Sequence, residues 1–527
     1  MNHADAITNT RSSLLRVAAN AASLLTTDLL NKVTTFVLYA LIGRYLGAEA
    51  FGQFSLGLLL VYVFQVLASV GLPNLLTREI AQRIARAPRL LSNGLVAASL
   101  TGGLAMLAMV ATAWLMHYDH TTTLVIVTLS CGLWPYAAAQ VFEASFRGTQ
   151  QMHFIALSNA VANSVKVVGG VWLLHHGYGI IELAALLVIV RVLILLTDAL
   201  LYFAWSGKRL IGWDRRYVWA LVRRSSTFLG IDAAIASWSA VDALILSKFM
   251  SPLEVGLYSA ALQLLQPASL VYLSIVGSIF PAMCHRHRQT LEPRLTSPQS
   301  DTPAETALYA LTRWMVAFLL MLGLPAVVLI IAFADIILQL AYHDAAFMQS
   351  VPIMQIASFA LIAQCFTTIL GHALWAADRE ADTLRIVVVN LTANVIISSI
   401  TIYNWGLIGA AAGTLLVSFL NVIQHYVVFL RVFERQPVDY QIMNPIAAAL
   451  VMAAVICFTP AALADGLLGF LPQWLHSLIA QWTVTPQRYV LGLLGLAVYA
   501  IAVLSLIAVA HGGPRKLRDG FFSPLVS

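Results

Sequence analysis

Two stretches that align without gaps decide the fold of this 527-residue chain. They are GRYLGAEAFGQFSLG at 43–57 and SKFMSPLEVGLYSAA at 247–261, which stand 204 residues apart and match Gly52 to Gly256. Each copy ends one apolar segment, forms a short turn and begins the next apolar segment. The alignment therefore predicts an internal repeat.

A second pair of stretches supports the repeat. HHGYGIIELAA at 175–185 aligns with IYNWGLIGAAA at 402–412, at an offset of 227 residues. The offset has grown by 23 residues, and the polar stretch 285–306 is about that long. One insertion thus explains the difference between the two offsets, which favours a chain built from two halves.

The composition places both halves in a membrane. Charged residues make up 10% of the chain, against about 25% in soluble domains, and 60% of the chain is hydrophobic. Fourteen apolar segments are long enough to cross a bilayer, which takes about 20 helical residues. They are 20–42, 53–76, 92–116, 122–145, 153–175, 180–203, 225–249, 256–281, 311–333, 350–375, 383–402, 407–430, 444–463 and 489–511. The sequence predicts an all-α polytopic membrane protein and excludes a soluble enzyme.

These spans divide into two predicted lobes and a C-terminal region. Residues 1–206 and 225–433 hold six spans each, and residues 434–527 hold two additional spans and a tail. Because six is even, both lobes begin on the same side of the membrane. We therefore expect parallel repeats related by an axis along the membrane normal, as in rocking transporters.

The distribution of Lys and Arg predicts the orientation. Of the 30 cations, 24 fall in connections on one side of the membrane and only Arg44, Lys248 and Arg488 on the other. Cytoplasmic loops carry this excess of positive charge, so both termini are predicted to be cytoplasmic. The pI of about 9.1 then reflects topology, and no nucleic-acid partner is expected.

The sequence offers no enzyme signature. No GxxxxGK[ST] phosphate-binding loop is present, so ATP hydrolysis by this chain is not expected. The four cysteines are far apart and the histidines lack metal-ligand spacing. We therefore expect no catalytic residue, no metal site and no cofactor.

Three cations remain inside the spans, namely Lys32, Lys166 and Arg191, all near mid-depth of the first lobe. A charge in hydrocarbon needs a partner or a water-filled cavity. One hypothesis is that they line a central cavity and neutralise a substrate pyrophosphate or an acidic sugar. The alternative is internal pairing of Lys32 with Asp28 and of Arg191 with Asp198.

Acidic residues inside the spans have two interpretations. Asp232 and Asp242 lie in the seventh span. Together with Asp28 and Asp198, they are candidates either for ion coupling by proton exchange or for pairing with cations across the lobe interface. Glu143 stands one turn from Arg147, and these two residues are expected to form an ion pair.

Several ordered stretches resemble the Wzx-type lipid-linked oligosaccharide flippases of the multidrug/oligosaccharidyl-lipid/polysaccharide superfamily. The first lobe contributes GRYLGAEAFGQFSLGLLL and then GLPNLLTREIAQ at 71–82. The second lobe contributes VDALILSKFMSPLEVGLYSAALQL at 241–264, SIFPAM at 278–283, GHALWAADREADTLRIVVVNLTANVIISS at 371–399 and NWGLIGAAAGTLL at 404–416.

This resemblance implies a function. Such a protein translocates undecaprenyl-pyrophosphate-linked oligosaccharide across the bacterial inner membrane by alternating access, for O-antigen, capsule or exopolysaccharide synthesis. Its expected partners are the lipid-linked substrate, membrane lipid, and a polysaccharide polymerase and chain-length regulator. Two alternatives stay open, an ion-coupled multidrug exporter and a non-transporting scaffold of a polysaccharide synthase complex. Three midplane cations argue against export of cationic drugs.

The orientation is testable by cysteine labelling in a variant without the four native cysteines. Cysteines introduced within 78–90 or 208–224 should react with an impermeant reagent only from the cytoplasmic side, because these segments carry the excess of Arg and Lys. Cysteines at 119 or 346 should react only from outside. Labelling of both sets from one face would contradict the topology and the repeat.

Overall fold

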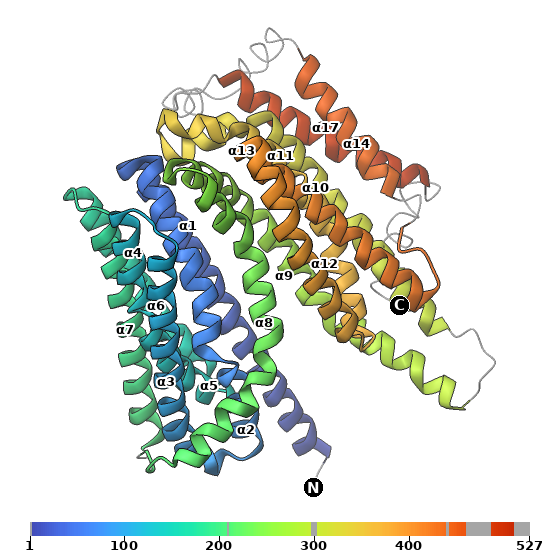
Figure 1. The fold of residues 1–527 in the computed structure, drawn as a ribbon. Helices are drawn as coiled ribbons and strands as arrows, with labels where there is room; N and C mark the ends of the chain where they lie inside the picture. Colours follow the sequence, from blue (N-terminus) through green and yellow to red (C-terminus); the bar gives the residue numbers. More distant parts are fainter. Residues whose placement is uncertain (1–2, 208–209, 297–302, 439–441, 460–485, 511–527) are drawn as a thin grey trace. The chain divides into compact units, whose positions relative to one another are not determined.

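A computed structural model describes residues 3–207, 210–296, 303–438, 442–459 and 486–510 (Figure 1). All regular structure in these ranges is helical, which confirms the all-α prediction. The elements are α1 (His3–Ser69), α2 (Leu72–Gln82), η1 (Ile84–Arg86), α3 (Ala87–Leu115), α4 (His120–Ser130), α5 (Leu133–Gly148), α6 (Met152–His175), α7 (Ile180–Ser206), α8 (Arg215–Phe249), α9 (Pro252–Thr296), α10 (Pro303–Tyr342), η2 (Ala345–Ser350), α11 (Val351–Ser358), α12 (Ala360–Ala376), α13 (Glu380–Phe433), α14 (Met443–Phe458) and α17 (Pro486–Ala510).

Each of the fourteen predicted spans corresponds to helical structure. Two long helices, α1 and α13, contain two spans each, joined at a glycine with non-helical backbone. Gly47 in α1 has φ 79° and Gly406 in α13 has φ 56°, a region that glycine enters without steric cost. The fourth span is divided between α4 and α5, and the tenth between α11 and α12.

The polar stretch 285–306 is largely helical. Helix α9 continues to Thr296 and α10 begins at Pro303, so only residues 297–302 of this stretch lie outside the described part of the chain. Pro303 occupies a helix N-terminus, where its missing N–H removes no hydrogen bond.

The helices group into two compact units. The first unit comprises residues 1–259 with 341–346, and the second comprises 260–340 with 347–527. The first unit therefore includes α8, which the sequence assigned to the second lobe. The division into two six-helix lobes with boundaries 1–206 and 225–433 stays a prediction.

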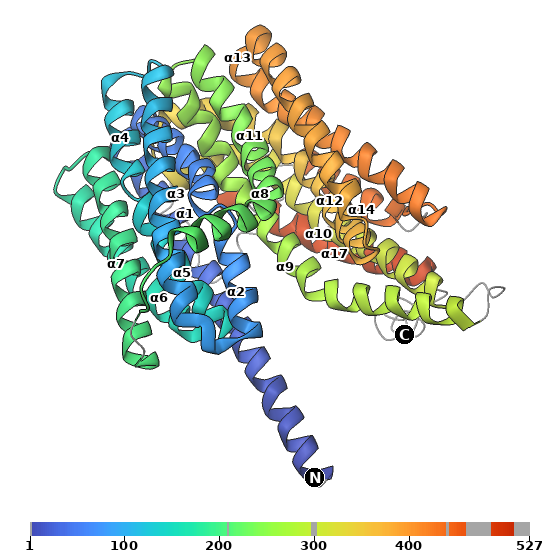
Figure 2. The ribbon, with the colours of Figure 1, turned by 60° about the horizontal axis from the view of Figure 1, so that its bottom comes forward.

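Within the first unit, α1 is the central element. It packs against α6, α3, α8 and α4, while α5 packs against α3, α2 and α7. Its first turns lead away from the other helices of the unit (Figure 2). The long, bent α1 is thus the helix against which α3, α4, α6 and α8 all pack.

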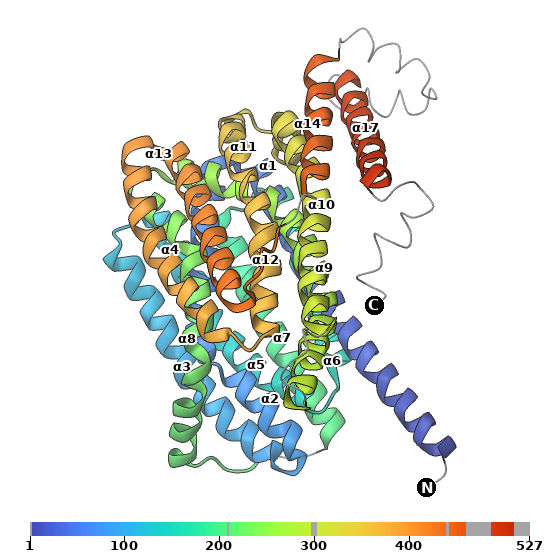
Figure 3. The same ribbon diagram turned by 90° about the vertical axis from the view of Figure 1, so that its right-hand side faces the viewer.

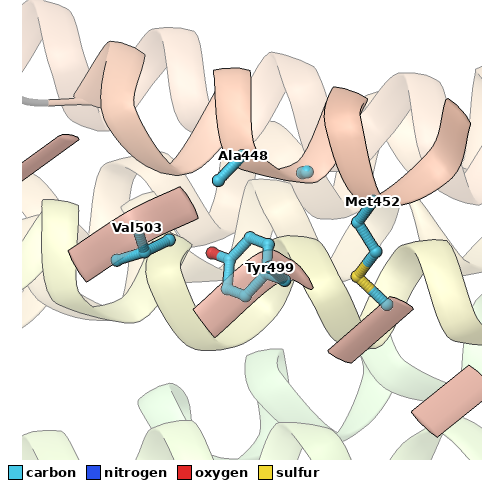
Figure 4. Close-up of a cluster of buried hydrophobic side chains, with 5 residues drawn as sticks. Ala448, Met452, Tyr499 and Val503 are labelled. Carbon is cyan, nitrogen blue, oxygen red and sulfur yellow. The ribbon is translucent and has the colours of Figure 1, made fainter. Parts of the chain in front are cut away.

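Within the second unit, the two additional C-terminal helices α14 and α17 lie side by side (Figure 3). Ala448 and Met452 of α14 pack against Tyr499 and Val503 of α17 (Figure 4). The Tyr499 hydroxyl donates a hydrogen bond of 2.8 Å to the backbone oxygen of Met321, which attaches the pair to α10.

Residues with a left-handed backbone conformation (positive φ) recur at helix ends with nearly constant spacing. His117 and His343 are 226 residues apart, Gln150 and Asp378 are 228 apart, and Gly207 and Glu434 are 227 apart. The first member of each pair follows α3, α5 or α7, where a left-handed residue commonly ends a helix. An internal repeat would produce this spacing, which matches the later of the two offsets found in the sequence.

Gly52 and Gly256, which the first aligned pair of stretches matches, lie where α1 and α9 cross inside the first unit. A Cβ on Gly52 would lie 1.9 Å from the backbone oxygen of Pro252, and a Cβ on Gly256 would lie 2.0 Å from that of Ala48. Only glycine permits two helices to approach with backbone against backbone. The first stretch of sequence quoted above therefore folds as the crossing point of α1 and the start of α9.

Arg44 and Lys248, which the first aligned pair of stretches matches, each bond to a carbonyl at the end of a helix. Arg44 Nε donates a hydrogen bond of 2.7 Å to the backbone oxygen of Ala341 at the end of α10. Lys248 Nζ donates to the backbone oxygen of Met116 at the end of α3. Terminal carbonyls have no partner within their helix, so each cation caps a helix that comes from the other half of the sequence.

Gly52→Ala should lower the melting temperature of the purified protein and its abundance in the membrane, because the backbone of Pro252 cannot move aside. The matched control is Gly103→Ala in α3, where a Cβ meets nothing within 4 Å. There alanine should be neutral or stabilising by up to about 1 kcal/mol. Equal melting temperatures for the two variants would contradict the crossing.

Candidate functional site

Two neighbouring cavities lie entirely within the first unit. The deep cavity has a volume of about 390 Å³ and the inner cavity about 450 Å³. They share one wall, formed by Asn31, Tyr62, Gln65, Tyr136, Asn159, Arg191 and Ile194. Four helices supply these residues, namely α1, α5, α6 and α7.

The two cavities follow one another along the helices. The inner cavity adds residues nearer the start of α1 and the end of α5, such as Thr27 and Arg147. The deep cavity adds residues further along α1 and α6, such as Leu38 and Lys166. If the predicted orientation holds, the inner cavity lies on the cytoplasmic side of the shared wall and the deep cavity beyond it.

Lys166 lines the deep cavity from α6. Its side chain is buried, and Nζ donates one hydrogen bond of 3.1 Å to the hydroxyl of Thr35 in α1. An ammonium group has three donors, and no carboxylate lies within ion-pair distance of it in the described residues. The Lys166 charge is thus available to an anion in the cavity.

Arg191 lies in the wall that both cavities share. Its guanidinium stacks on the ring of Tyr136, with 4.7 Å between Cζ and the ring centroid. It makes no ion pair within the described part of the chain, and in particular none with Asp198. Whether Arg191 binds substrate or pairs internally stays a prediction.

Lys32 is exposed and lines the inner cavity. The structure therefore places all three predicted cations around the same pair of cavities. The side chain of Asp28, its proposed partner, lies outside what the structure describes, so that pairing stays a hypothesis.

Asp198 in α7 is fully buried and is not among the residues that line the inner cavity. Among the described residues, no hydrogen bond of standard geometry reaches either carboxylate oxygen, and the polar groups near it include Ser158, Glu143 and Arg147. Asp242 of α8 accepts a hydrogen bond of 3.5 Å from the hydroxyl of Tyr258. The side chain of Asp232 lies outside the described residues.

The predicted pair of Glu143 and Arg147 is confirmed. Arg147 Nη2 lies 2.7 Å from Glu143 Oε2, and Gln140 Nε2 donates to the same oxygen at 3.2 Å. Both charged residues line the inner cavity. Arg147 is therefore the ion-pair partner of the buried Glu143 carboxylate.

A set of amide side chains joins α1 to α6, and the sequence analysis did not identify it as a site. Asn163 donates a hydrogen bond of 2.7 Å to Asn31, which donates at 3.3 Å to Asn159. Thr34 donates to Asn163 at 2.8 Å. The one available signal was that Asn163 aligns with Asn390 in the repeat, and Asn390 likewise bonds to Asn421 at 2.8 Å in the second unit.

In the described ranges, no three His, Cys, Asp or Glu side chains come together as ligands for a metal ion. The arrangement is instead a polar, cationic pocket among apolar helices. Such a pocket can bind an anionic group together with uncharged polar groups.

The fold of the chain is similar to the folds of solved membrane transporters. Its fold matches a lipid II flippase, MurJ, in an inward closed conformation, with a TM-score of 0.71 over 92% of this chain and 98% of that one, at 11% identity. It also matches an inward-facing multidrug resistance transporter of the MATE family, within the MOP superfamily, with a TM-score of 0.62 over 76% of this chain and 94% of the other, at 12% identity. At these identities the likeness defines the fold class alone.

Sequence comparison identifies the family within that fold class. Residues 17–287 match the model of the polysaccharide biosynthesis protein family, and the chain belongs to this family. The chain is also 23% identical over 189 residues to the probable low-salt glycan biosynthesis flippase Agl15 of Haloferax volcanii. That alignment spans 36% of this chain and 37% of the relative. The resemblance to polysaccharide flippases is confirmed.

The two arginines of the inner cavity should behave differently when removed. Arg147→Ala removes the ion-pair partner of the buried Glu143, and breaking a buried ion pair destabilises a protein by about 3 kcal/mol or more. Arg191→Ala breaks no ion pair among the described residues. Membrane abundance and melting temperature should therefore fall for Arg147→Ala and stay near wild type for Arg191→Ala. A similar loss in both would show that Arg191 has a structural partner.

Proposed function

We propose that this protein translocates an oligosaccharide linked to undecaprenyl pyrophosphate from the inner to the outer leaflet of a bacterial inner membrane. The observation that supports the proposal is that Lys166 and Arg191 both line one cavity and form no ion pair with any described carboxylate. Arg191 suits bidentate contact with phosphate oxygens, while Lys166 acts as a point charge. Membership in the polysaccharide biosynthesis protein family supports the glycan part of the substrate.

Transport would proceed by alternating access, with the glycan in a hydrophilic cavity and the lipid chain in the bilayer. The protein would act as a transporter and not as an enzyme, with both termini in the cytoplasm. The translocated glycan would be used in O-antigen, capsule or exopolysaccharide synthesis. The partners of the protein there would be a polysaccharide polymerase and a chain-length regulator. Asp198, Asp242, Asp28 and Asp232 are the candidates for ion coupling.

The multidrug exporter alternative is favoured by one observation, the fold match to a MATE transporter. Against it stands the charge of the cavity. Lys32, Lys166, Arg191 and Arg147 line the two cavities, and Glu143 is the one carboxylate among their described lining residues. A cationic drug would be repelled by this lining, so a lipid-linked glycan anion is the better candidate.

Lys166→Ala and Arg191→Ala should abolish glycan export in cells while the protein still accumulates in the membrane. The reason is that each removes an anion-binding charge and no internal ion pair. Lys166→Arg and Arg191→Lys serve as controls, because they keep the charge and should retain part of the export. Surface glycan and membrane abundance are measured together.

The double variant Arg191→Ala/Asp198→Ala separates substrate binding from pairing. If Arg191 served only to compensate Asp198, removal of both would restore export. We expect export to stay absent, because the substrate contact is lost either way. Restored export in the double variant would falsify the substrate role of Arg191.

A further inference from the structure

The polar side chains around the two cavities fall into two classes. Five amide side chains line them, those of Asn31, Gln65, Gln140, Asn159 and Asn163. Four of these make side-chain hydrogen bonds within the protein. Gln65 makes none to any described residue. A polar group whose hydrogen bonds are already formed is structural, whereas one that faces a cavity with none is free to bind a ligand.

Tyr62 shares this property. It lies three residues before Gln65 on α1, so the two side chains are neighbours on one helix face. Its side chain is 42% exposed, and its hydroxyl has no hydrogen-bond partner among the described residues. Tyr62 and Gln65 both belong to the wall shared by the two cavities.

The chemistry of this pair suits a carbohydrate. A carboxamide offers a donor and an acceptor together, which matches neighbouring sugar hydroxyls or an acetamido group. A tyrosine offers an apolar ring for the C–H face of a sugar and a hydroxyl at its edge. Neither residue carries the charge that an anion would require.

Tyr62 and Gln65 share a cavity wall with Arg191. This arrangement indicates which part of the substrate they would contact. Arg191 lies in the same wall, with its guanidinium on the ring of Tyr136. A pyrophosphate held by Arg191 would place the first sugar, which is bonded directly to it, against the remainder of that wall. We propose that Tyr62 and Gln65 are specificity-determining residues that bind the sugar adjacent to the pyrophosphate. This inference rests on the proposed function.

Binding of two synthetic lipids to the purified full-length protein tests it. One is undecaprenyl pyrophosphate and the other is the same lipid carrying a single N-acetylhexosamine. Wild type should bind the sugar-bearing lipid more tightly, by about fivefold to tenfold for one or two net hydrogen bonds. In Gln65→Leu and Tyr62→Leu this ratio of dissociation constants should approach one, with binding of the bare lipid unchanged.

Two controls make the result specific. Gln140→Leu removes a cavity amide that is already bonded to Glu143, so it should leave the ratio as in wild type. Lys166→Ala should weaken both lipids alike and also preserve the ratio. A ratio that persists in Gln65→Leu and Tyr62→Leu, or a wild type without preference, overturns the inference and leaves the proposed function standing. Failure of wild type to bind either lipid would overturn both.

Discussion

The hydrogen-bonded contact between α1 and α6 is the interaction on which the candidate site depends. Lipid chains are as apolar as leucine, so helices in a membrane gain little from burying apolar side chains against each other. Asn163 and Asn31, with Thr34 and the bond from Lys166 to Thr35, supply the polar contact instead. The same bonds fix Lys166 at the deep cavity, so one set of residues holds the helices and orients the charge.

The glycine crossing supplies a different constraint at the end of the first span. Gly52 and Gly256 allow backbone contact that no other residue would permit, and the reciprocal caps by Arg44 and Lys248 satisfy carbonyls at the ends of α10 and α3. Polar contact at mid-depth and close packing at the end together define where α1 can lie. The cavities occupy the side of α1 that faces α5, α6 and α7.

The sequence predicted what depends on local pattern and depth. Apolar length predicted the fourteen spans, the repeat drew attention to Gly52 and Gly256, and depth selected Lys166 and Arg191. It did not resolve whether Arg191 pairs with Asp198, because a spacing of seven residues places two side chains on one face but does not fix their rotamers. Nor did it identify the asparagine contact, because Asn31 and Asn163 are ordinary polar residues until α1 and α6 are brought together.

The contrast between satisfied and unsatisfied groups connects stability with function in this cavity. Arg147 forms an ion pair with the buried carboxylate of Glu143 and the asparagines bond to one another, so these groups stabilise the protein without a ligand. Lys166 and Arg191 make no ion pair within the described residues, where Lys166 bonds to a hydroxyl and Arg191 stacks on an aromatic ring. That arrangement costs at least a few kcal/mol in a membrane. Since an uncharged side chain would avoid this cost, the simplest physical reason to keep both cations is an anion that enters the cavity and offsets it.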